Sequence, residues 1–380
     1  PRELVSGRLR DPARQLRKGE GMLHAMIMAG GGGTRFWPRS RQQRPKQFLA
    51  LGGERTLLQQ AMDRIEALLP ADRTWVITGK AYRPETSRQL PQLPADHIVG
   101  EPCGRDTAPC IGLGAALIAR RDPEAVMLVT PADHVIEPVR EFERAAQAAV
   151  AMAEEHPSAL VTFGIPPTFP STGYGYIHRG AEVGQRQGVS VFRVQRFEEK
   201  PATDRAERFL ASGEYYWNSG IFVWQANTVL EELRRQQPKL HDAVRRIADG
   251  WDTPRRDAVL RQEFEALPKI SIDYAVMERA AEVLVVKAPY RWDDVGSWLA
   301  LERMNPQDAE RNTVLATHCG VNTKQCVIVG DAGRLIATLG VENLLIVQDG
   351  DATLIADRRD EGAVKQLVEL LKKKGLGRYL

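Results

Sequence analysis

Four consecutive glycines at residues 30–33 directly follow a short apolar segment at residues 25–28. The apolar segment predicts a buried β-strand, and the glycines predict a turn whose exposed N–H groups form a concave anion site. Arg35 and Lys46 follow the turn and bring positive charge within reach of that anion. The stretch therefore predicts a phosphate-binding loop at the carboxyl end of the first strand. The residues expected to surround the phosphates are Gly30, Gly31, Gly33 and Thr34.

Two common phosphate-binding motifs do not fit this stretch. The P-loop requires GxxxxGK[ST], and no Lys-Ser or Lys-Thr follows the glycines. The dinucleotide fingerprint GxGxxG requires a third glycine where Arg35 or Phe36 stands, which excludes an NAD-dependent dehydrogenase. A glycine-rich hairpin or flexible loop is the plainer interpretation, and the glycines alone would favour it. The arginine after the turn and the Pro45-Lys46 pair instead favour a site for a triphosphate.

The segment from residue 30 to residue 49, GGGGTRFWPRSRQQRPKQFL, resembles the signature GGxGTRLxPxxxxxPK of the sugar-1-phosphate nucleotidyltransferases. Its last three residues, QFL, resemble the mannose-1-phosphate guanylyltransferase branch, and Gly32 stands where the family usually has serine. The resemblance implies transfer of a guanylyl group from GTP to α-D-mannose 1-phosphate, which gives GDP-mannose and pyrophosphate. It also implies that Arg35 steadies the departing pyrophosphate and that Lys46 contacts the α-phosphate region.

The composition is that of an ordinary globular protein, with 43% apolar and 27% charged residues. The net charge of +3, from 52 basic and 49 acidic residues, gives no support for nucleic-acid binding. Local basic runs are interpreted as solvated faces or as contacts to an anionic small substrate. No apolar run approaches the ~18 residues that cross a bilayer, so no membrane contact is expected. Four cysteines without a CxxC pair predict reduced thiols in a cytoplasmic protein.

A chain of 380 residues is expected to form two domains. Alternating strand and helix patterns predict an α/β catalytic domain at residues 22–305, with a Rossmann-like, mostly parallel sheet. Residues 1–21 are basic and polar, and are expected to be a disordered extension rather than a secretory signal. The expected strands are residues 25–28, 74–78, 125–130, 159–164, 189–198, 220–224 and 283–288, and the expected helices are residues 56–69, 108–121, 142–152, 226–237 and 241–266.

Residues 306–380 differ in pattern from the preceding chain. Short strand-like pieces punctuated by glycines predict a small β-solenoid-like domain, which ends in a helix at residues 361–374. Because one layer of strands cannot bury both of its faces, this domain should pack on the catalytic domain or on a partner subunit. A homodimer is also expected.

Acidic side chains follow two of the expected strands. Asp133 comes directly after residues 125–130, where ligands bind in open α/β sheets. Mg²⁺ typically takes one or two carboxylates together with phosphate oxygens, so Asp133 is a candidate metal ligand, with a turn or helix-cap role as the alternative. Asp293 and Asp294 lie in the segment WDDVGSW. The family resemblance implies that Asp294 shares the metal with Asp133. Asp293 is the fallback, and a solvated turn is the plain alternative.

Three further segments resemble the sugar-binding motifs of the family. The Glu199-Lys200 pair lies in FEEKP, Asn218 in NSGIF, and Gly175 in TGYGYI. The resemblance implies that Lys200 binds the sugar phosphate, that Glu199 and Asn218 bind sugar hydroxyls, and that Gly175 lets the hexose approach the backbone. An exposed charge pair and a turn asparagine are the alternatives. The segment IDYAVME at residues 272–278 is expected near this site, in a structural or a binding role.

The segment EPCGRDTAP, at residues 101–109, resembles the ExxxRNTAPA motif of the guanylyl branch. Guanine presents N1–H and a 2-amino group, and a carboxylate accepts from both. Glu101 or Asp106 could therefore read the base, with Arg105 beside them. Asp106 stands where the branch has asparagine, and capping of the following helix is an equally ordinary role for it.

No histidine–aspartate or serine–histidine pair stands out in the sequence. None is needed for the implied reaction, because the attacking phosphate oxygen is already ionised at neutral pH. Catalysis would depend on positioning and on charge stabilisation by Arg35, Lys46 and Lys200. Two other functions stay open: thymidylyl or uridylyl transfer to glucose 1-phosphate, and a non-catalytic regulatory protein that binds sugar nucleotides.

Overall fold

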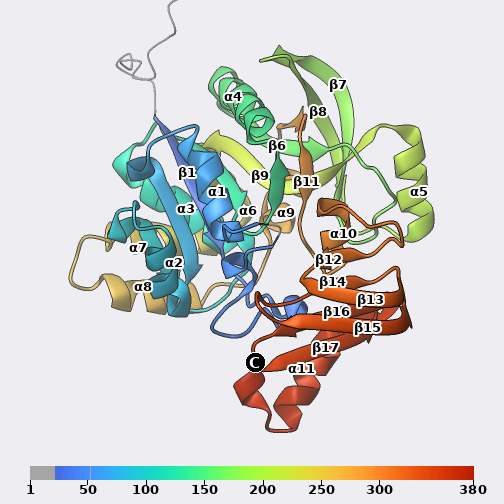
Figure 1. The fold of residues 1–380 in the computed structure, drawn as a ribbon. Helices are drawn as coiled ribbons and strands as arrows, with labels where there is room; N and C mark the ends of the chain where they lie inside the picture. Colours follow the sequence, from blue (N-terminus) through green and yellow to red (C-terminus); the bar gives the residue numbers. More distant parts are fainter. Residues whose placement is uncertain (1–21, 52) are drawn as a thin grey trace, which may run out of the picture.

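The computed structural model describes residues 22–51 and 53–380, so the expectation for residues 1–21 lies outside the described residues. The strands of the central sheet are β1 (Leu23–Ala29), β2 (Thr74–Gly79), β3 (Ile98–Glu101), β4 (Val126–Pro131), β6 (Leu160–Ile165), β7 (Tyr176–Arg186), β8 (Val189–Glu198), β9 (Tyr215–Gln225) and β10 (Val283–Lys287). They form a nine-stranded sheet in the order β3-β2-β1-β4-β9-β6-β10-β8-β7 (Figure 1). Only β8 and β9 run against the other strands of this sheet, so it is mostly parallel, as predicted.

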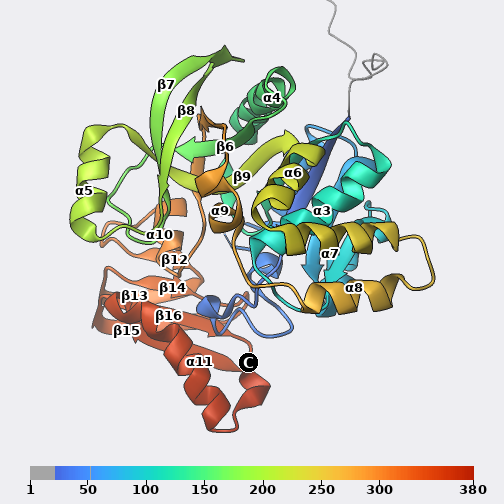
Figure 2. The ribbon, with the colours of Figure 1, turned by 180° about the vertical axis from the view of Figure 1, so that it is seen from behind.

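Helices cover both faces of this sheet (Figures 1 and 2). Alternate residues of β1 point to opposite faces: Ile27 packs among α1 and α4, and Met26 packs among α3, α6 and α7. The helices of this part are α1 (Leu57–Glu66), α2 (Arg83–Gln89), α3 (Thr107–Arg121), α4 (Val139–Glu155), α5 (Thr203–Ser212), α6 (Ala226–Gln236), α7 (Pro238–Asp249), α8 (Arg256–Glu265), α9 (Ile272–Ala275) and α10 (Ala300–Met304). Among the described residues, none of the helices combines the length and the apolar character needed to cross a bilayer.

Local sequence signals explain where two of these helices begin. Thr56 and Gln59 form a capping box at the start of α1, in which each side chain bonds to the other residue's backbone N–H. The Asp106 carboxylate accepts a hydrogen bond from the N–H of Thr107 at the start of α3. The small residues of α3 let it approach the sheet closely, because a Cβ at Gly114 would collide with the sulfur of Met26.

Two expectations for the second half of this part need correction. The helix predicted over residues 241–266 is interrupted, because Gly250 and Pro254 lie between α7 and α8 and proline cannot donate a helical hydrogen bond. The strand predicted over residues 220–224 begins earlier, at Tyr215, so that Asn218 lies within β9.

In the C-terminal β region, which runs from β12 to α11, the strands β12 to β16 pair in parallel and alternate between two sheets, as in a solenoid, and β17 then pairs antiparallel with β16 (Figure 1). Its elements are β12 (Thr313–Leu315), β13 (Thr317–Lys324), β14 (Val327–Val329), β15 (Leu335–Glu342), β16 (Leu344–Asp349), β17 (Ala352–Asp357) and α11 (Val364–Lys373). The region shares a hydrophobic core with the phosphate loop and with the WDDVGSW segment, through Phe36, Trp37 and Trp298. One of the two predicted arrangements, packing on the preceding domain, is therefore confirmed.

Candidate active site

The glycine turn lies at the end of β1, and its geometry requires glycine at one position above all. Gly33 has φ of +50°, and a Cβ placed there would lie 2.6 Å from the backbone nitrogen of Lys46. The Gln47 side chain donates to the carbonyl of Ala29, the last residue of β1, with an N–O distance of 2.9 Å. These contacts hold the Pro45-Lys46 segment directly against the glycine turn.

A polar cavity of about 220 Å³ opens beside this turn. Its lining comes from three parts of the chain: the phosphate loop, the residues after β4, and the residues after the short strand β11 (Arg291–Asp293). The lining residues are Gly30, Gly31, Gly33, Arg35, Phe36, Lys46, Gln47, Asp133, His134, Asp294, Val295 and Gly296. The cations and acids expected at the phosphate site therefore meet in one cavity. Thr34 follows the turn in a short 3₁₀ segment and is not part of this lining.

Lys46 connects the acidic segments of this cavity. Its Nζ lies 2.9 Å from Oδ2 of Asp133 and also donates to the backbone carbonyl of Asp294. Lys46 is only 8% exposed, so these contacts are made away from bulk water. Burial is the largest single influence on the Asp133 carboxyl and would raise its pKa, but the charges of Lys46 and His134 and the hydrogen bonds to the carboxylate together outweigh it, so the pKa falls below its ordinary value. Asp133 is therefore held as a carboxylate.

Strand pairing explains why the two acidic segments are neighbours. β11 pairs with β5 (Val135–Glu137) in antiparallel register, with Asp293 opposite Val135. This register brings Asp294 beside Asp133. The Tyr174 hydroxyl donates to Oδ1 of Asp294 over 2.9 Å, and burial, followed by the charge of Asp294, raises the pKa of Tyr174.

Asp293 points elsewhere. Its carboxylate pairs with the Arg303 guanidinium at 2.5 Å and accepts the N–H of Val295. It lines a separate apolar cavity of about 470 Å³ that also borders Trp217 and Trp292. Between the two acids, Asp294 is the one that faces the phosphate loop.

Arg35 is the other cation that lines this cavity. Nη1 of Arg35 donates to the backbone carbonyl of Gly296 over 3.1 Å, and the side chain is otherwise exposed. His134 also lines the cavity, and its Nδ1 accepts from the indole N–H of Trp292 over 3.1 Å. Burial lowers the pKa of His134, which suits a neutral ring that accepts this bond.

A second polar cluster surrounds Gly175. The Asn218 N–H donates to the Gly175 carbonyl over 2.8 Å, and a Cβ at Gly175 would lie 2.6 Å from Oε2 of Glu199. The Lys200 ammonium donates to Oε1 of Glu199 over 2.7 Å. The three predicted sugar-site motifs therefore converge. Asp273, to which sequence reasoning assigned no role of its own, joins them because it accepts from Nδ2 of Asn218 over 2.7 Å.

Glu101 and Asp106, the two candidate base readers, have different environments. Asp106 is exposed and bonded to the start of α3. Glu101 is 7% exposed, and its Oε1 has no hydrogen-bond partner in the part of the chain that the structure describes. Burial raises the pKa of Glu101 to about 7. Arg105 donates to the carbonyl of Glu265, which ties this loop to the end of α8.

The family model described as nucleotidyl transferase matches residues 24–311. The chain belongs to the nucleotidyl transferase family. A second model, described as MannoseP isomerase/GMP-like beta-helix domain, matches residues 316–371. These matches confirm the resemblance carried by the glycine segment and the β-helix-like architecture of the C-terminal β region.

Within the nucleotidyl transferases, the similarity is to mannose-1-phosphate guanylyltransferases. The chain is 41% identical over 358 residues to the mannose-1-phosphate guanylyltransferase of Escherichia coli strain K12, a match that spans 93% of this chain and 74% of that protein. It is 41% identical over 356 residues to the xanthan biosynthesis protein XanB of Xanthomonas campestris pv. campestris strain B100, spanning 92% and 73%. A crystal structure from Thermus thermophilus, described as a mannose-1-phosphate geranyltransferase, matches with a TM-score of 0.81 and 37% identity over 92% of this chain and 99% of that one.

The acids of this nucleotidyl transferase fit a divalent cation that is completed by substrate. Among residues 22–51 and 53–380, no cluster of three or more histidine, cysteine or acidic side chains is placed to hold a metal ion. Asp133 and Asp294 nevertheless line one cavity together with the phosphate loop. Mg²⁺ commonly takes one or two carboxylates and fills its other positions with water and substrate phosphates, so this donor set suits it.

Proposed function

We propose that this nucleotidyl transferase moves a guanylyl group from GTP to α-D-mannose 1-phosphate and releases pyrophosphate and GDP-mannose. The observation that carries the proposal is the meeting of Arg35, Lys46, Asp133 and Asp294 in one cavity beside the glycine turn. The choice of base and sugar is supported by the 41% identity to a protein named mannose-1-phosphate guanylyltransferase.

In this reaction an oxygen of mannose 1-phosphate bonds to the α-phosphorus of GTP, and the bond from that phosphorus to the bridging oxygen of pyrophosphate breaks. The attacking oxygen is already ionised, so no side chain has to remove a proton. The N–H groups of Gly30, Gly31 and Gly33, which line the cavity, would hold the triphosphate, and the N–H of Thr34 would join them from just outside the lining. Lys46 would stabilise charge at the α-phosphate, and Arg35 would stabilise the departing pyrophosphate.

Asp133 and Asp294 would hold a Mg²⁺ ion, which when bound supplies positive charge beside the triphosphate. Lys46 already contacts Asp133 and the backbone of Asp294, so the same ammonium would keep both acidic segments in place as the nucleotide enters. Tyr174 would orient the Asp294 carboxylate through its hydroxyl.

On the sugar side, Lys200 would bind the phosphate of mannose 1-phosphate. Glu199 and Asn218 would bind hydroxyls, and the bare backbone of Gly175 would let the ring approach. Asp273 orients Asn218 by accepting from its amide nitrogen, which leaves the amide oxygen to the N–H of Gly220 and to the substrate.

For the base, we favour Glu101 over Asp106. Asp106 is already used as the cap of α3, whereas Oε1 of Glu101 is buried without a partner among the described residues. Guanine N1–H and its 2-amino group would supply the missing donors. Arg105 would support nucleotide binding by fixing the loop that carries Glu101 and Asp106.

The test is pyrophosphate release with Mg²⁺ across GTP, ATP, UTP and dTTP, each paired with the 1-phosphates of mannose, glucose and galactose. The proposal expects turnover to be fastest for GTP with mannose 1-phosphate. A preference for UTP or dTTP with glucose 1-phosphate would favour the second candidate reaction. Nucleotide binding without any pyrophosphate release would favour a regulatory protein.

We further propose a catalytic domain at residues 22–305, a β domain at residues 306–380, and a homodimer that forms through the β domain. The support for the dimer is an apolar face on the β13–β15 sheet. Val321 and Leu339 are register partners, and Leu335 lies on the same face, yet all three side chains are largely exposed. A symmetric contact between two copies would bury the same residues twice. The four free cysteines suit a reducing cytoplasm, where we place the enzyme.

A further inference from the structure

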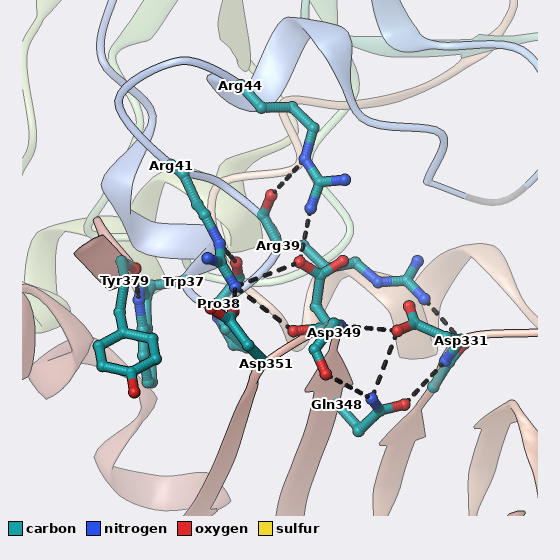
Figure 3. A network of polar contacts seen from close by, with 12 residues as sticks. Trp37, Pro38, Arg39, Arg41, Arg44, Asp331, Gln348, Asp349, Asp351 and Tyr379 are labelled. Carbon is teal, nitrogen blue, oxygen red and sulfur yellow. Dashed lines mark hydrogen bonds and ion pairs between the residues drawn. The ribbon is translucent and has the colours of Figure 1, made fainter. Parts of the chain in front are cut away.

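The phosphate loop, residues 30–49, contains a tight turn between Arg41 and Arg44 that lies on the C-terminal β region (Figure 3). Arg41 and Arg44 bond to each other twice through their backbones, with N–O distances of 3.0 and 2.9 Å. Pro45 and Lys46 follow at once. Because proline fixes φ of its own residue, little freedom separates the turn from the catalytic lysine. The position of this turn therefore sets the position of Lys46.

Asp349, the last residue of β16, holds both arginines of the turn (Figure 3). Its Oδ2 lies 2.6 Å from Nη2 of Arg44 and 3.7 Å from Nη2 of Arg41. Asp349 is 8% exposed, so the carboxylate is largely removed from water. The second acid at this corner, Asp351, contacts Arg41 only and its side chain is 57% exposed.

The corner that carries Asp349 is itself braced. Oδ2 of Asp331 accepts the N–H of Gly350 over 2.7 Å, next to Asp349 in the chain. The Arg39 guanidinium donates to the carbonyl of Gly330 over 2.8 Å, which anchors the loop to the neighbouring turn of the β region (Figure 3). The carboxylate is therefore presented from a fixed place rather than from a mobile tip.

Removing this carboxylate would leave Arg44 without a counter-charge, whereas Arg41 would keep its ion pair with Asp351 and its bonds to the carbonyls of Pro38 and Asp349. Unpaired charges are costly where they are partly buried, and the neighbouring Arg41 repels a like charge, so Arg44 would turn outward. The exposed Arg44 side chain can do so easily, because only its bond to the Arg39 carbonyl would remain. The turn between Arg41 and Arg44 would then shift, and Lys46 with it.

We propose that Asp349 of the C-terminal β region is a positioning residue for the guanylyl transfer proposed above, on which this inference rests. By holding Arg41 and Arg44, it fixes the turn that delivers Lys46 to Asp133 and to the backbone of Asp294. The β region thus takes part in building the nucleotide site, although none of its residues lines the polar cavity beside the glycine turn.

The test compares Asp349→Ala with a matched control, Glu302→Gln. The Glu302 carboxylate pairs with Arg358 of the β region at 2.6 Å, so it also joins that region to the rest of the chain, but through α10 and not through the Arg41–Arg44 turn. In Asp349→Ala we expect GTP affinity, measured by calorimetry with Mg²⁺, to fall roughly tenfold, and KM for GTP to rise with it. KM for mannose 1-phosphate should stay unchanged, as should both constants in Glu302→Gln. A smaller folded fraction would lower the rate without changing these affinities.

A second comparison asks whether Asp349 acts through the arginines. In an Arg41→Ala, Arg44→Ala background, Asp349→Ala should cause no further loss of GTP affinity, because residues that share one network are not additive. Asp349→Glu should recover part of the affinity. If Asp349→Ala fails to fold, Asp349→Asn, which keeps the side-chain volume, takes its place.

The two proposals fail in different ways. Wild-type turnover combined with normal GTP affinity in Asp349→Ala, or losses that add in the triple variant, would overturn the positioning role alone. Absence of pyrophosphate release by the wild-type protein would overturn the proposed reaction. In that case the calorimetric GTP affinities would still decide whether Asp349 shapes the site.

Discussion

The Nζ of Lys46 lies 2.9 Å from Oδ2 of Asp133 and also donates to the backbone carbonyl of Asp294, so one ammonium group joins segments that are 87 and 248 residues away in the chain. The phosphate loop supplies the lysine, the end of β4 supplies one acid, and the β5–β11 ladder brings the other. The site therefore depends on the relative placement of three loops.

Gly33→Ala should impair the site, because the residue has positive φ and the new Cβ would meet the backbone nitrogen of Lys46. A displacement of about 1 Å at a catalytic group can cost on the order of 10² in rate, and we expect kcat/KM for GTP to fall by roughly that factor. Gly32→Ala is the control, since a Cβ there meets nothing within 4 Å. Equal activity of the two variants would contradict this account of the loop.

The free energy of unfolding should depend on pH because of the Glu101 carboxyl. Burial raises its pKa from 4.5 to about 7, so the folded protein holds this proton more tightly than the unfolded chain does. The free energy of unfolding therefore falls as the pH rises from about 4.5 to about 7. The total fall is about 3 kcal/mol, at ~1.4 kcal/mol per pH unit. Glu101→Gln should lack this decline, so its stability relative to wild type should improve towards pH 8. Urea unfolding at several pH values measures the difference, and parallel curves would show that the carboxyl is not perturbed.

Substitution of Asp273 should weaken the binding of mannose 1-phosphate and leave the binding of GTP unchanged. Asp273→Ala leaves the amide nitrogen of Asn218 without its acceptor, so the side chain can rotate away from the substrate. Loss of a hydrogen bond to a charged group costs about 1.5 kcal/mol or more, so KM for mannose 1-phosphate should rise roughly tenfold. Asp273→Asn keeps an acceptor oxygen and should show a smaller rise. A matching rise in KM for GTP would place Asp273 outside the sugar site.

Leu339 should be required for the formation of the proposed homodimer. Its side chain is 75% exposed on the β13–β15 face, and a charge there would oppose burial against a second copy. Light scattering should give the mass of two chains for the wild-type protein and of one chain for Leu339→Glu. Val139→Glu, at the start of α4, is the control at another exposed apolar residue. A wild-type monomer would exclude the proposed dimer.

Much of the fold and of the phosphate site could be predicted from sequence. The alternation of apolar strands and helices indicated the sheet, and the rule that ligands lie beyond strand carboxyl ends selected Asp133. The family motif alone favoured Asp294 over Asp293 as a candidate metal ligand. The structure supplies the physical reason, which is the ion pair of Asp293 with Arg303.

Other parts depend on contacts that no local pattern contains. Asp273 lies in a one-turn helix, and its contact with Asn218 joins residues 55 positions apart. Tyr174 lies in the segment TGYGYI, in which the family resemblance gives a role only to Gly175, although the Tyr174 hydroxyl reaches Asp294. The basic run after the glycines was interpreted as a solvated face or as a substrate contact. Arg41 and Arg44 instead bind Asp349, about 300 residues away, and such pairing cannot be read from charge alone.

The most direct measurement compares Asp294→Asn with Asp293→Asn in a pyrophosphate-release assay with GTP, mannose 1-phosphate and increasing Mg²⁺. The account predicts that Asp294→Asn loses on the order of 10² or more in kcat, because it removes one of the two carboxylates at the nucleotide phosphates. Asp293→Asn should stay within a few-fold of wild type, because its partner Arg303 lies outside the phosphate cavity. Equal losses in both variants, or full activity in Asp294→Asn, would contradict the central claim that the phosphate loop and two converging acids form the reaction site.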